Sequence, residues 1–139
     1  MTEAPTAADA ATKALEELVA AIDDCVLRLQ HSRARAQELL ASRAAGVSWL
    51  ETVTAESRPL VVESVSAVLA TLARAGSTFR REQAYALQGE RVSINRIAAL
   101  FGVTRQRISA LLRERAAVDT AVDEAAGPAV QATSASIAL

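Results

Sequence analysis

One stretch of the sequence constrains the fold more than any other. Between Ala7 and about Ala44 there is no glycine or proline, and apolar side chains recur with the alternating three-and-four spacing of a helix that buries one stripe. A helix of roughly 36 residues, rising about 1.5 Å per residue, reaches about 50 Å and is longer than a small domain is wide. The rest of one chain cannot cover that stripe, so the sequence predicts a homodimer. A break near His31 or Ser32, with both halves folding back on the chain, is the alternative.

The predicted dimer interface is the apolar stripe of this helix. Its residues are Leu15, Leu18, Ile22, Cys25, Leu29 and Leu39. Arg28, Arg33 and Arg35 lie beside the stripe and replace the paired charges of a simple two-stranded zipper, so a bundle-like seam is expected. Because Cys25 occupies a seam position, we interpret it as a buried apolar thiol rather than as a redox switch.

Composition favours an all-α fold. Alanine accounts for 32 of the 139 residues, whereas glycine and proline together number 8 and the aromatic residues 4. Such a chain favours helices packed on small side chains over a sandwich or a barrel. One cysteine and one histidine exclude an internal disulfide, a cysteine-based zinc cluster and the usual histidine-containing metal and acid–base sites within one chain. We therefore expect no metal, no cofactor and no enzymatic activity.

The amino terminus and the hydropathy pattern bear on location. Residues 1–6 lack the basic and apolar regions of a signal peptide. The richest apolar run, residues 60–75, is cut by Glu63 and Arg74, so no run is long enough to span a bilayer. The sequence predicts a soluble cytoplasmic protein without a membrane partner.

Glycine and proline divide the next part of the chain. Gly46 ends the long helix, and the Ser-Arg-Pro sequence at 57–59 is a helix start, because proline in the first turn loses no needed donor. Residues 59–75 are apolar around most of the helix circumference, which predicts a core helix, and Gly76 supplies its stop.

Two further segments follow Gly76. Ser77 or Thr78 is expected to cap a helix that runs to Gln88. Residues 117–139 are rich in alanine, serine, threonine and Gly-Pro, a composition that predicts a mobile tail.

Charge is unevenly distributed, although the net charge is only -1. Residues 1–30 carry six acids against two cations, whereas residues 91–116 carry six arginines against Glu114 alone. A basic segment within an acidic chain predicts a local anionic partner. The alternative is a solvated helix face with no partner.

Two short helical patterns joined by a tight turn lie in this basic segment. The first covers residues 94–101 after the cap Ser93, and the second covers about 105–115 after the cap Thr104. Gly102 lies where the first helix must reverse, and it adopts left-handed dihedrals at little cost. The residues that face the inside of the bend are Ile97, Phe101, Val103, Ile108 and Leu111, with the small Ala98 where the helices cross.

This pattern resembles the helix-turn-helix motif of DNA-binding transcriptional regulators. When the motif is counted as twenty residues from Ile94, Ala98 lies at the small fifth position and Gly102 at the ninth. The five inward apolar residues lie at the fourth, eighth, tenth, fifteenth and eighteenth positions. The resemblance covers 21 of the 139 residues. The alanine-rich, arginine-over-lysine composition is similar to that of proteins from high-GC bacteria such as actinobacteria.

The resemblance implies a sequence-specific transcriptional regulator that binds double-stranded DNA as a homodimer, with recognition helix 105–115 in the major groove. The residues expected to enter the groove are Arg105, Gln106, Ser109, Ala110 and Arg113. The residues expected to contact phosphates are Arg91, Arg96, Thr104 and Arg107. Such a protein associates with the nucleoid when it is bound to DNA, and no residue pattern specifies a small-molecule effector.

The expected fold therefore has three parts: a helical dimerisation region at 1–76, a trihelical helix-turn-helix DNA-binding domain at 77–116, and a flexible, disordered tail at 117–139. The dimerisation region combines the long amino-terminal helix with the core helix. The alternative function is a helical protein–protein interaction module, either an adaptor or an antitoxin-like protein. Its amino-terminal helices bind a protein partner, and DNA contact is secondary or absent.

Overall fold

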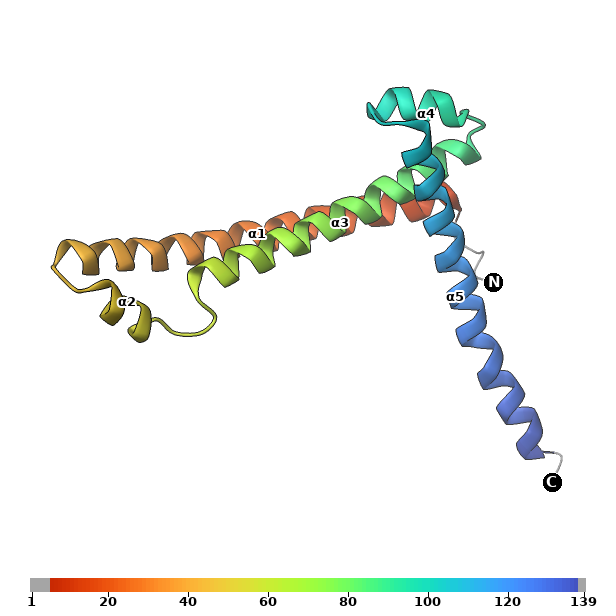
Figure 1. Ribbon diagram of the computed structural model, residues 1–139. Helices are drawn as coiled ribbons and strands as arrows, with labels where there is room; N and C mark the ends of the chain where they lie inside the picture. The colour runs from red at the N-terminus through yellow and green to blue at the C-terminus, as the bar shows by residue number, and fades with distance from the viewer. Residues whose placement is uncertain (1–5, 138–139) are drawn as a thin grey trace. The chain divides into compact units, whose positions relative to one another are not determined.

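The structure is a computed structural model that describes residues 6–137, and the side chains of residues 6–125. This part of the chain consists of helices and connecting loops without a strand, which confirms the predicted all-α class. The helices are α1 (Ala7–Ala44), α2 (Trp49–Ala55), α3 (Val61–Gly89), α4 (Ile94–Phe101) and α5 (Arg105–Ile137) (Figure 1). None of these helices is long and apolar enough to cross a membrane.

The chain forms two compact units. The hairpin unit comprises residues 13–79, and the carboxyl-terminal unit comprises residues 80–137 together with residues 6–12. The boundary thus follows Phe79, close to the division after residue 76 that the sequence predicts. The separate functions assigned to the two parts stay predictions.

In the hairpin unit, α1 and α3 lie side by side and run antiparallel (Figure 1). The Sγ of Cys25 on α1 donates to the carbonyl oxygen of Val68 on α3 at 3.7 Å, and the Nη2 of Arg35 donates to the carbonyl oxygen of Ser57 at 2.9 Å. Helix α1 passes through Ser32 without interruption. The predicted continuous helix is therefore confirmed, and the alternative of a break is not observed.

Short helix α2 and a loop connect α1 to α3. The Oγ of Ser48 accepts a hydrogen bond from the backbone N–H of Glu51 at 3.1 Å, which caps α2. A carboxylate oxygen of Glu56 accepts from the backbone N–H of Val61 at 2.7 Å. This bond satisfies a free donor at the start of α3, so the helix begins at Val61 rather than at Pro59 as the sequence predicts.

Helix α3 is covered on one side only within the hairpin unit. Val68, which faces α1, is 1% exposed, whereas Val62 is 74% and Leu69 is 57% exposed. The sequence predicts a core helix here because apolar residues surround most of its circumference. The difference arises because a two-helix hairpin offers α3 a single long neighbour.

Helix α3 also continues through Gly76, where the sequence predicts a stop, and ends only at Gly89. The prediction of a separate helix capped by Ser77 or Thr78 is therefore wrong. The residues of that segment form the last turns of α3. A glycine in a helix interior costs only about 1 kcal/mol relative to alanine. The alanine and leucine residues before it offset that cost, so the helix propagates.

Helix α5 extends to Ile137, well past Arg115, where the sequence analysis ends it. The residues that follow Arg115 are rich in alanine, the strongest helix former, and this composition carries the helix onward. The predicted mobility of residues 117–139 stays a prediction, and residues 138–139 lie outside the described residues.

Candidate nucleic-acid interface

Helix α4 has the ends that its sequence predicts. Ser93 has an extended backbone, and its Oγ accepts a hydrogen bond from the backbone N–H of Arg96 at 3.2 Å. Gly102 is left-handed, with φ 66° and ψ 33°, and the backbone N–H of Val103 donates to the carbonyl oxygen of Ala98 at 3.0 Å. These bonds satisfy the last carbonyls of the helix and turn the chain toward α5. The predicted helix and its glycine turn are confirmed.

The start of α5 is also the predicted one. The Oγ1 of Thr104 accepts a hydrogen bond from the backbone N–H of Arg107 at 3.1 Å, and the helix begins at Arg105. The first turn of α5 contains no acidic residue. The positive end of the helix dipole and the arginines of this turn therefore favour an anion at the same place.

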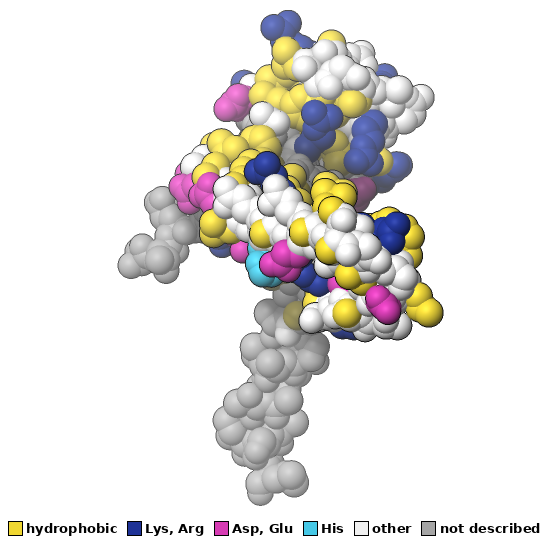
Figure 2. Space-filling model, turned by 90° about the vertical axis from the view of Figure 1, so that its left-hand side faces the viewer, with side chains coloured by type: hydrophobic (Ala, Val, Ile, Leu, Met, Phe, Trp, Pro, Cys, Tyr) yellow, Lys and Arg dark blue, Asp and Glu magenta, His cyan; other side chains and the backbone are white. Residues whose placement is uncertain are grey.

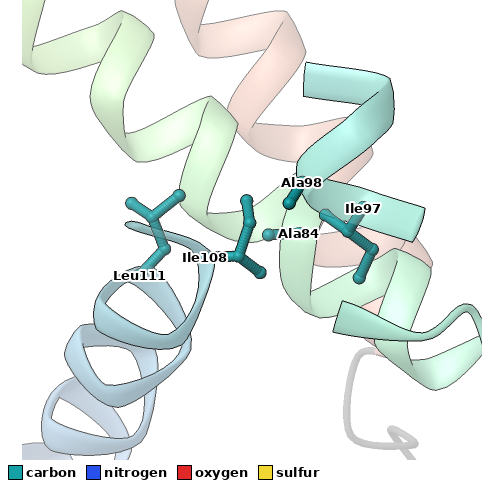
Figure 3. Packing of buried hydrophobic residues seen from close by; sticks show 5 residues of the cluster. All are labelled: Ala84, Ile97, Ala98, Ile108 and Leu111. Carbon is teal, nitrogen blue, oxygen red and sulfur yellow. The ribbon is translucent and has the colours of Figure 1, made fainter. Parts of the chain in front are cut away.

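A small apolar core holds α4 and α5 against the last turns of α3 (Figure 3). Its buried members are Ala84 on α3, Ile97 and Ala98 on α4, and Ile108 and Leu111 on α5. The partly buried residues packed around them are Leu87, Val92, Ile94, Phe101, Val103 and Leu112. All the side chains predicted to face the inside of the bend belong to this core or its rim, so the core fixes how α5 lies against α4.

Substitution of Gly102 tests the turn between these helices. A Cβ atom at this position meets no atom within 4 Å, so only the left-handed backbone opposes a side chain. We expect Gly102→Ala to lower the free energy of unfolding by about 1–2 kcal/mol. Gly76→Ala is the matched control: it also meets no atom within 4 Å but lies inside α3. The control is expected to raise the free energy of unfolding by up to about 1 kcal/mol.

Urea unfolding of the two variants and of the native chain measures both effects. The two substitutions add the same methyl group in open space, so their opposite signs isolate the backbone conformation. If Gly102→Ala were as stabilising as Gly76→Ala, the left-handed turn would be misplaced.

The residues predicted to enter the major groove lie on the first three turns of α5. Arg105, Gln106 and Arg113 are exposed, whereas Ser109 and Ala110 are half-buried. Arginine and glutamine present donors and acceptors that match base edges in the major groove. Because Ser109 and Ala110 are small, they leave room for α5 to approach the base edges closely. DNA contact by these five residues stays a prediction.

The residues predicted to contact phosphates are exposed: Thr104, Arg107, Arg96 and Arg91. Arg91 has φ 67° and occupies the left-handed position just after α3. The backbone N–H of Val92 donates to the carbonyl oxygen of Leu87 at 3.0 Å and closes this turn. A side chain in this conformation costs about 1–2 kcal/mol, and glycine would avoid the cost. The strained arginine therefore favours a functional role for its guanidinium.

Arg80 is an exposed cation that the sequence analysis missed. Its guanidinium carbon lies 5.0 Å from the centroid of the Phe101 ring, at the end of α4. This cation–π contact holds a positive charge beside the turn that leads into α5. The Arg-Arg pair at 80–81 is a sequence signal for this cation, but it lies outside the basic segment at 91–116.

A partly buried ion pair joins α3 to α5. Glu82 is 7% exposed, and one of its carboxylate oxygens accepts a hydrogen bond from the Nε of Arg115 at 2.8 Å. The Arg115 guanidinium also binds Asp119 and lies 4.9 Å from the centroid of the Tyr85 ring. The hydrogen bond to Asp119, together with that to Glu82, raises the pKa of Arg115 above its ordinary value. Arg115 therefore stays cationic and is engaged inside the protein.

Exposed cations outnumber exposed acids around α4 and the start of α5. Within residues 80–114 the exposed cations are Arg80, Arg91, Arg96, Arg105, Arg107 and Arg113. The exposed acids of the same range are Glu90 and Glu114. On the face drawn in Figure 2, Lys and Arg side chains gather in the upper part of the molecule, which contains α4. A phosphate backbone is the anionic partner that such a surface suits.

The six residues predicted for the dimer interface differ in exposure within the hairpin unit. The exposed ones are Leu15, Ile22 and Leu29, and the half-buried ones are Leu18 and Leu39. Cys25 is 2% exposed and packs against α3 of the same chain. Cys25 is therefore not available to a second chain, which corrects its place in the predicted interface. One stripe of α1 faces α3 and a neighbouring stripe is exposed, and both repeat with heptad spacing. The sequence pattern therefore does not separate Cys25 from the exposed residues.

Comparison of the chain with models of protein families, with curated proteins and with solved structures found no match. In the part of the chain that the structure describes, no group of three His, Cys, Asp or Glu side chains is placed to hold a metal ion.

Proposed function

We propose that this chain is a sequence-specific, DNA-binding transcriptional regulator, in which α4 and the first turns of α5 bind double-stranded DNA. The observation that carries the proposal is the arrangement around Gly102. Two capped helices meet at a left-handed glycine over a shared buried core, and the second helix begins with an exposed turn that holds arginines and no acid. A helix-turn-helix motif presents its second helix to DNA from a turn of this kind, so these features support the proposal.

The proposed binding mode divides the exposed residues by role. Arg105, Gln106 and Arg113 on α5 enter the major groove and read base edges, with the small Ser109 and Ala110 between them. The phosphate contacts come from Arg91, Arg96, Thr104 and Arg107, with Arg80 as an addition. Because phosphate contacts carry no sequence information, they fix the position of α5 while its side chains discriminate between bases.

As part of this proposal, the regulator acts as a homodimer in the cytoplasm and associates with the nucleoid when bound. Two copies of α5 then read two half-sites, and the linked pair binds more tightly than one copy. The predicted interface on α1 supports this arrangement through its exposed members Leu15, Ile22 and Leu29.

The alternative function, a helical protein–protein interaction module, is favoured by one observation in the hairpin unit. Leu40, Trp49 and Leu50 are apolar and more than half exposed where α1 gives way to α2. Several large apolar side chains exposed within one short segment are typical of a protein contact. A module of this kind is expected to show no preference among DNA sequences.

Selection from a pool of random-sequence DNA duplexes separates the two functions. The native protein is expected to enrich duplexes that share one sequence. A Gln106→Ala/Arg113→Ala chain is expected to retain part of the salt-dependent binding and to lose the preference among sequences. If the native protein enriched no common sequence, the proposed regulator would be rejected in favour of the interaction module.

A further inference from the structure

An apolar face of the hairpin unit is left uncovered by the chain itself. On α1 the exposed row is Leu15, Val19, Ile22, Val26 and Leu29, with exposed fractions between 39% and 52%. On α3 the exposed members are Val62 and Leu69, which lie seven residues apart. The α1 row repeats with spacings of four and three residues, as in helices that pack along their length. We call these seven residues the apolar face.

The two rows lie on the same side of the hairpin. Cys25 and Val68 mark the sides of α1 and α3 that are turned toward each other. Glu17 on α1 lines one shallow groove together with Thr71 and Arg74 on α3, so one edge of the hairpin is polar. At about 100° per residue, both exposed apolar rows point away from that groove. The hairpin therefore has one polar face and one apolar face.

We infer that a second copy of this chain covers the apolar face, with the two α1 helices antiparallel across a two-fold axis. The row on α1 extends over about 21 Å, so its partner must offer an apolar helical surface of similar length. A second hairpin unit offers a surface of that length and spacing. A two-fold contact uses the same patch on both copies, so the apolar residues of each copy meet those of the other.

Charge at the ends of the row fixes the direction of the pairing. Arg33 continues the row four residues beyond Leu29, and Glu16 lies beside its other end. In an antiparallel pair, Arg33 of each copy lies beside Glu16 of the other, and the arginine stem covers part of Leu15. In a parallel pair, Arg33, which continues the row itself, would instead lie beside Arg33 of the other copy. The charges are therefore complementary only when the helices run in opposite directions.

This inference rests on the homodimer of the proposed function and deepens it, because it names the face that is covered and the direction of the pairing. Association through the apolar face involves residues 15–69 alone, and the residues proposed to contact DNA lie at 80 and beyond. The oligomeric state can be measured without DNA, so a monomeric chain would remove the homodimer from the proposed function and leave DNA binding by α4 and α5 to its own test.

Adjacent substitutions on α1 test the surface in the full chain. Val26 belongs to the apolar face, whereas its neighbour Leu27 is exposed on another side of α1, where it lines a groove with His31 and Pro59. By sedimentation, the native chain and a Leu27→Asp chain are expected to be dimers. A Val26→Asp chain buries an unpaired charge in each half of the contact. The dissociation constant of its dimer is therefore expected to be at least about 100-fold higher than that of the native dimer.

Both side chains are exposed in the single chain, so helix content measured by circular dichroism is expected to be retained in both variants. If the native chain sedimented as a monomer, the proposed pairing would be overturned, and the apolar face would need a different partner. A Val26→Asp chain that dimerises as tightly as the native one would overturn the choice of face.

Disulfide trapping tests the direction of the pairing. In the antiparallel arrangement, position 19 of one copy lies near position 29 of the other. A mixture of Val19→Cys and Leu29→Cys chains is therefore expected to form mixed disulfide-linked dimers under mild oxidation, and neither chain alone is expected to do so efficiently. The native Cys25 is buried and does not compete. Efficient self-linking of the Val19→Cys chain would show a parallel pair and overturn the proposed arrangement.

Discussion

Replacement of Glu82 with alanine is expected to lower the free energy of unfolding by about 3 kcal/mol, one of the two largest effects expected from the structure. Glu82 and Arg115 form an ion pair at 2.8 Å, and their side chains are only 10% and 16% exposed. Removal of the carboxylate leaves a largely buried guanidinium without its closest partner on α3. Because an arginine guanidinium stays protonated in proteins, deprotonation does not relieve that cost.

Two comparisons make this prediction specific. Asp119→Ala removes the other carboxylate that binds Arg115, but Asp119 is largely exposed, so its loss is expected to cost less than about 1 kcal/mol. A Glu82→Leu/Arg115→Leu chain removes both charges of this pair but leaves Arg81 without its 3.5 Å contact to Glu82, so it is expected to recover part of the native stability. Urea unfolding measures all three variants. Equal losses for Glu82→Ala and Asp119→Ala would show that the buried pair contributes little.

The second large effect concerns DNA affinity. An Arg105→Ala/Arg113→Ala chain is expected to bind its selected DNA sequence about 100-fold more weakly than the native chain or worse, because each arginine that contacts a base contributes about 1–3 kcal/mol. Both side chains are exposed, so the free energy of unfolding is expected to stay within about 0.5 kcal/mol of the native value.

The matched control is an Arg28→Ala/Arg74→Ala chain. It removes the same charge from exposed positions of the hairpin unit. Its affinity for the selected sequence is expected to stay within a few-fold of the native value, as measured by gel shift. If both double variants lost affinity equally, the binding would reflect total charge rather than contacts made by α5.

Local signals predicted the region around Gly102 correctly. The caps Ser93 and Thr104, the left-handed glycine and the burial of Ile97 and Ile108 all match the structure. Each of these features depends on residues within a few positions of one another, where the sequence pattern and the geometry are directly related.

Long-range packing explains most of what the sequence analysis missed. The pair of Glu82 and Arg115 joins residues 33 positions apart, so no local pattern marks it. The division of α1 into a stripe facing α3 and an exposed stripe likewise depends on where α3 lies. Gly76 illustrates the opposite case, because a local stop signal was overridden by the strong helix formers around it.

The salt dependence of DNA binding tests the central claim most directly. If each copy of a dimer neutralises about three phosphates, a plot of log K against log salt concentration for the native chain is expected to have a slope of roughly -5. A steep negative slope, reduced in the Arg105→Ala/Arg113→Ala chain and unchanged in the Arg28→Ala/Arg74→Ala chain, is the predicted result. A slope near zero, or no binding to duplex DNA at low salt, would contradict the assignment of α4 and α5 as a DNA-binding surface.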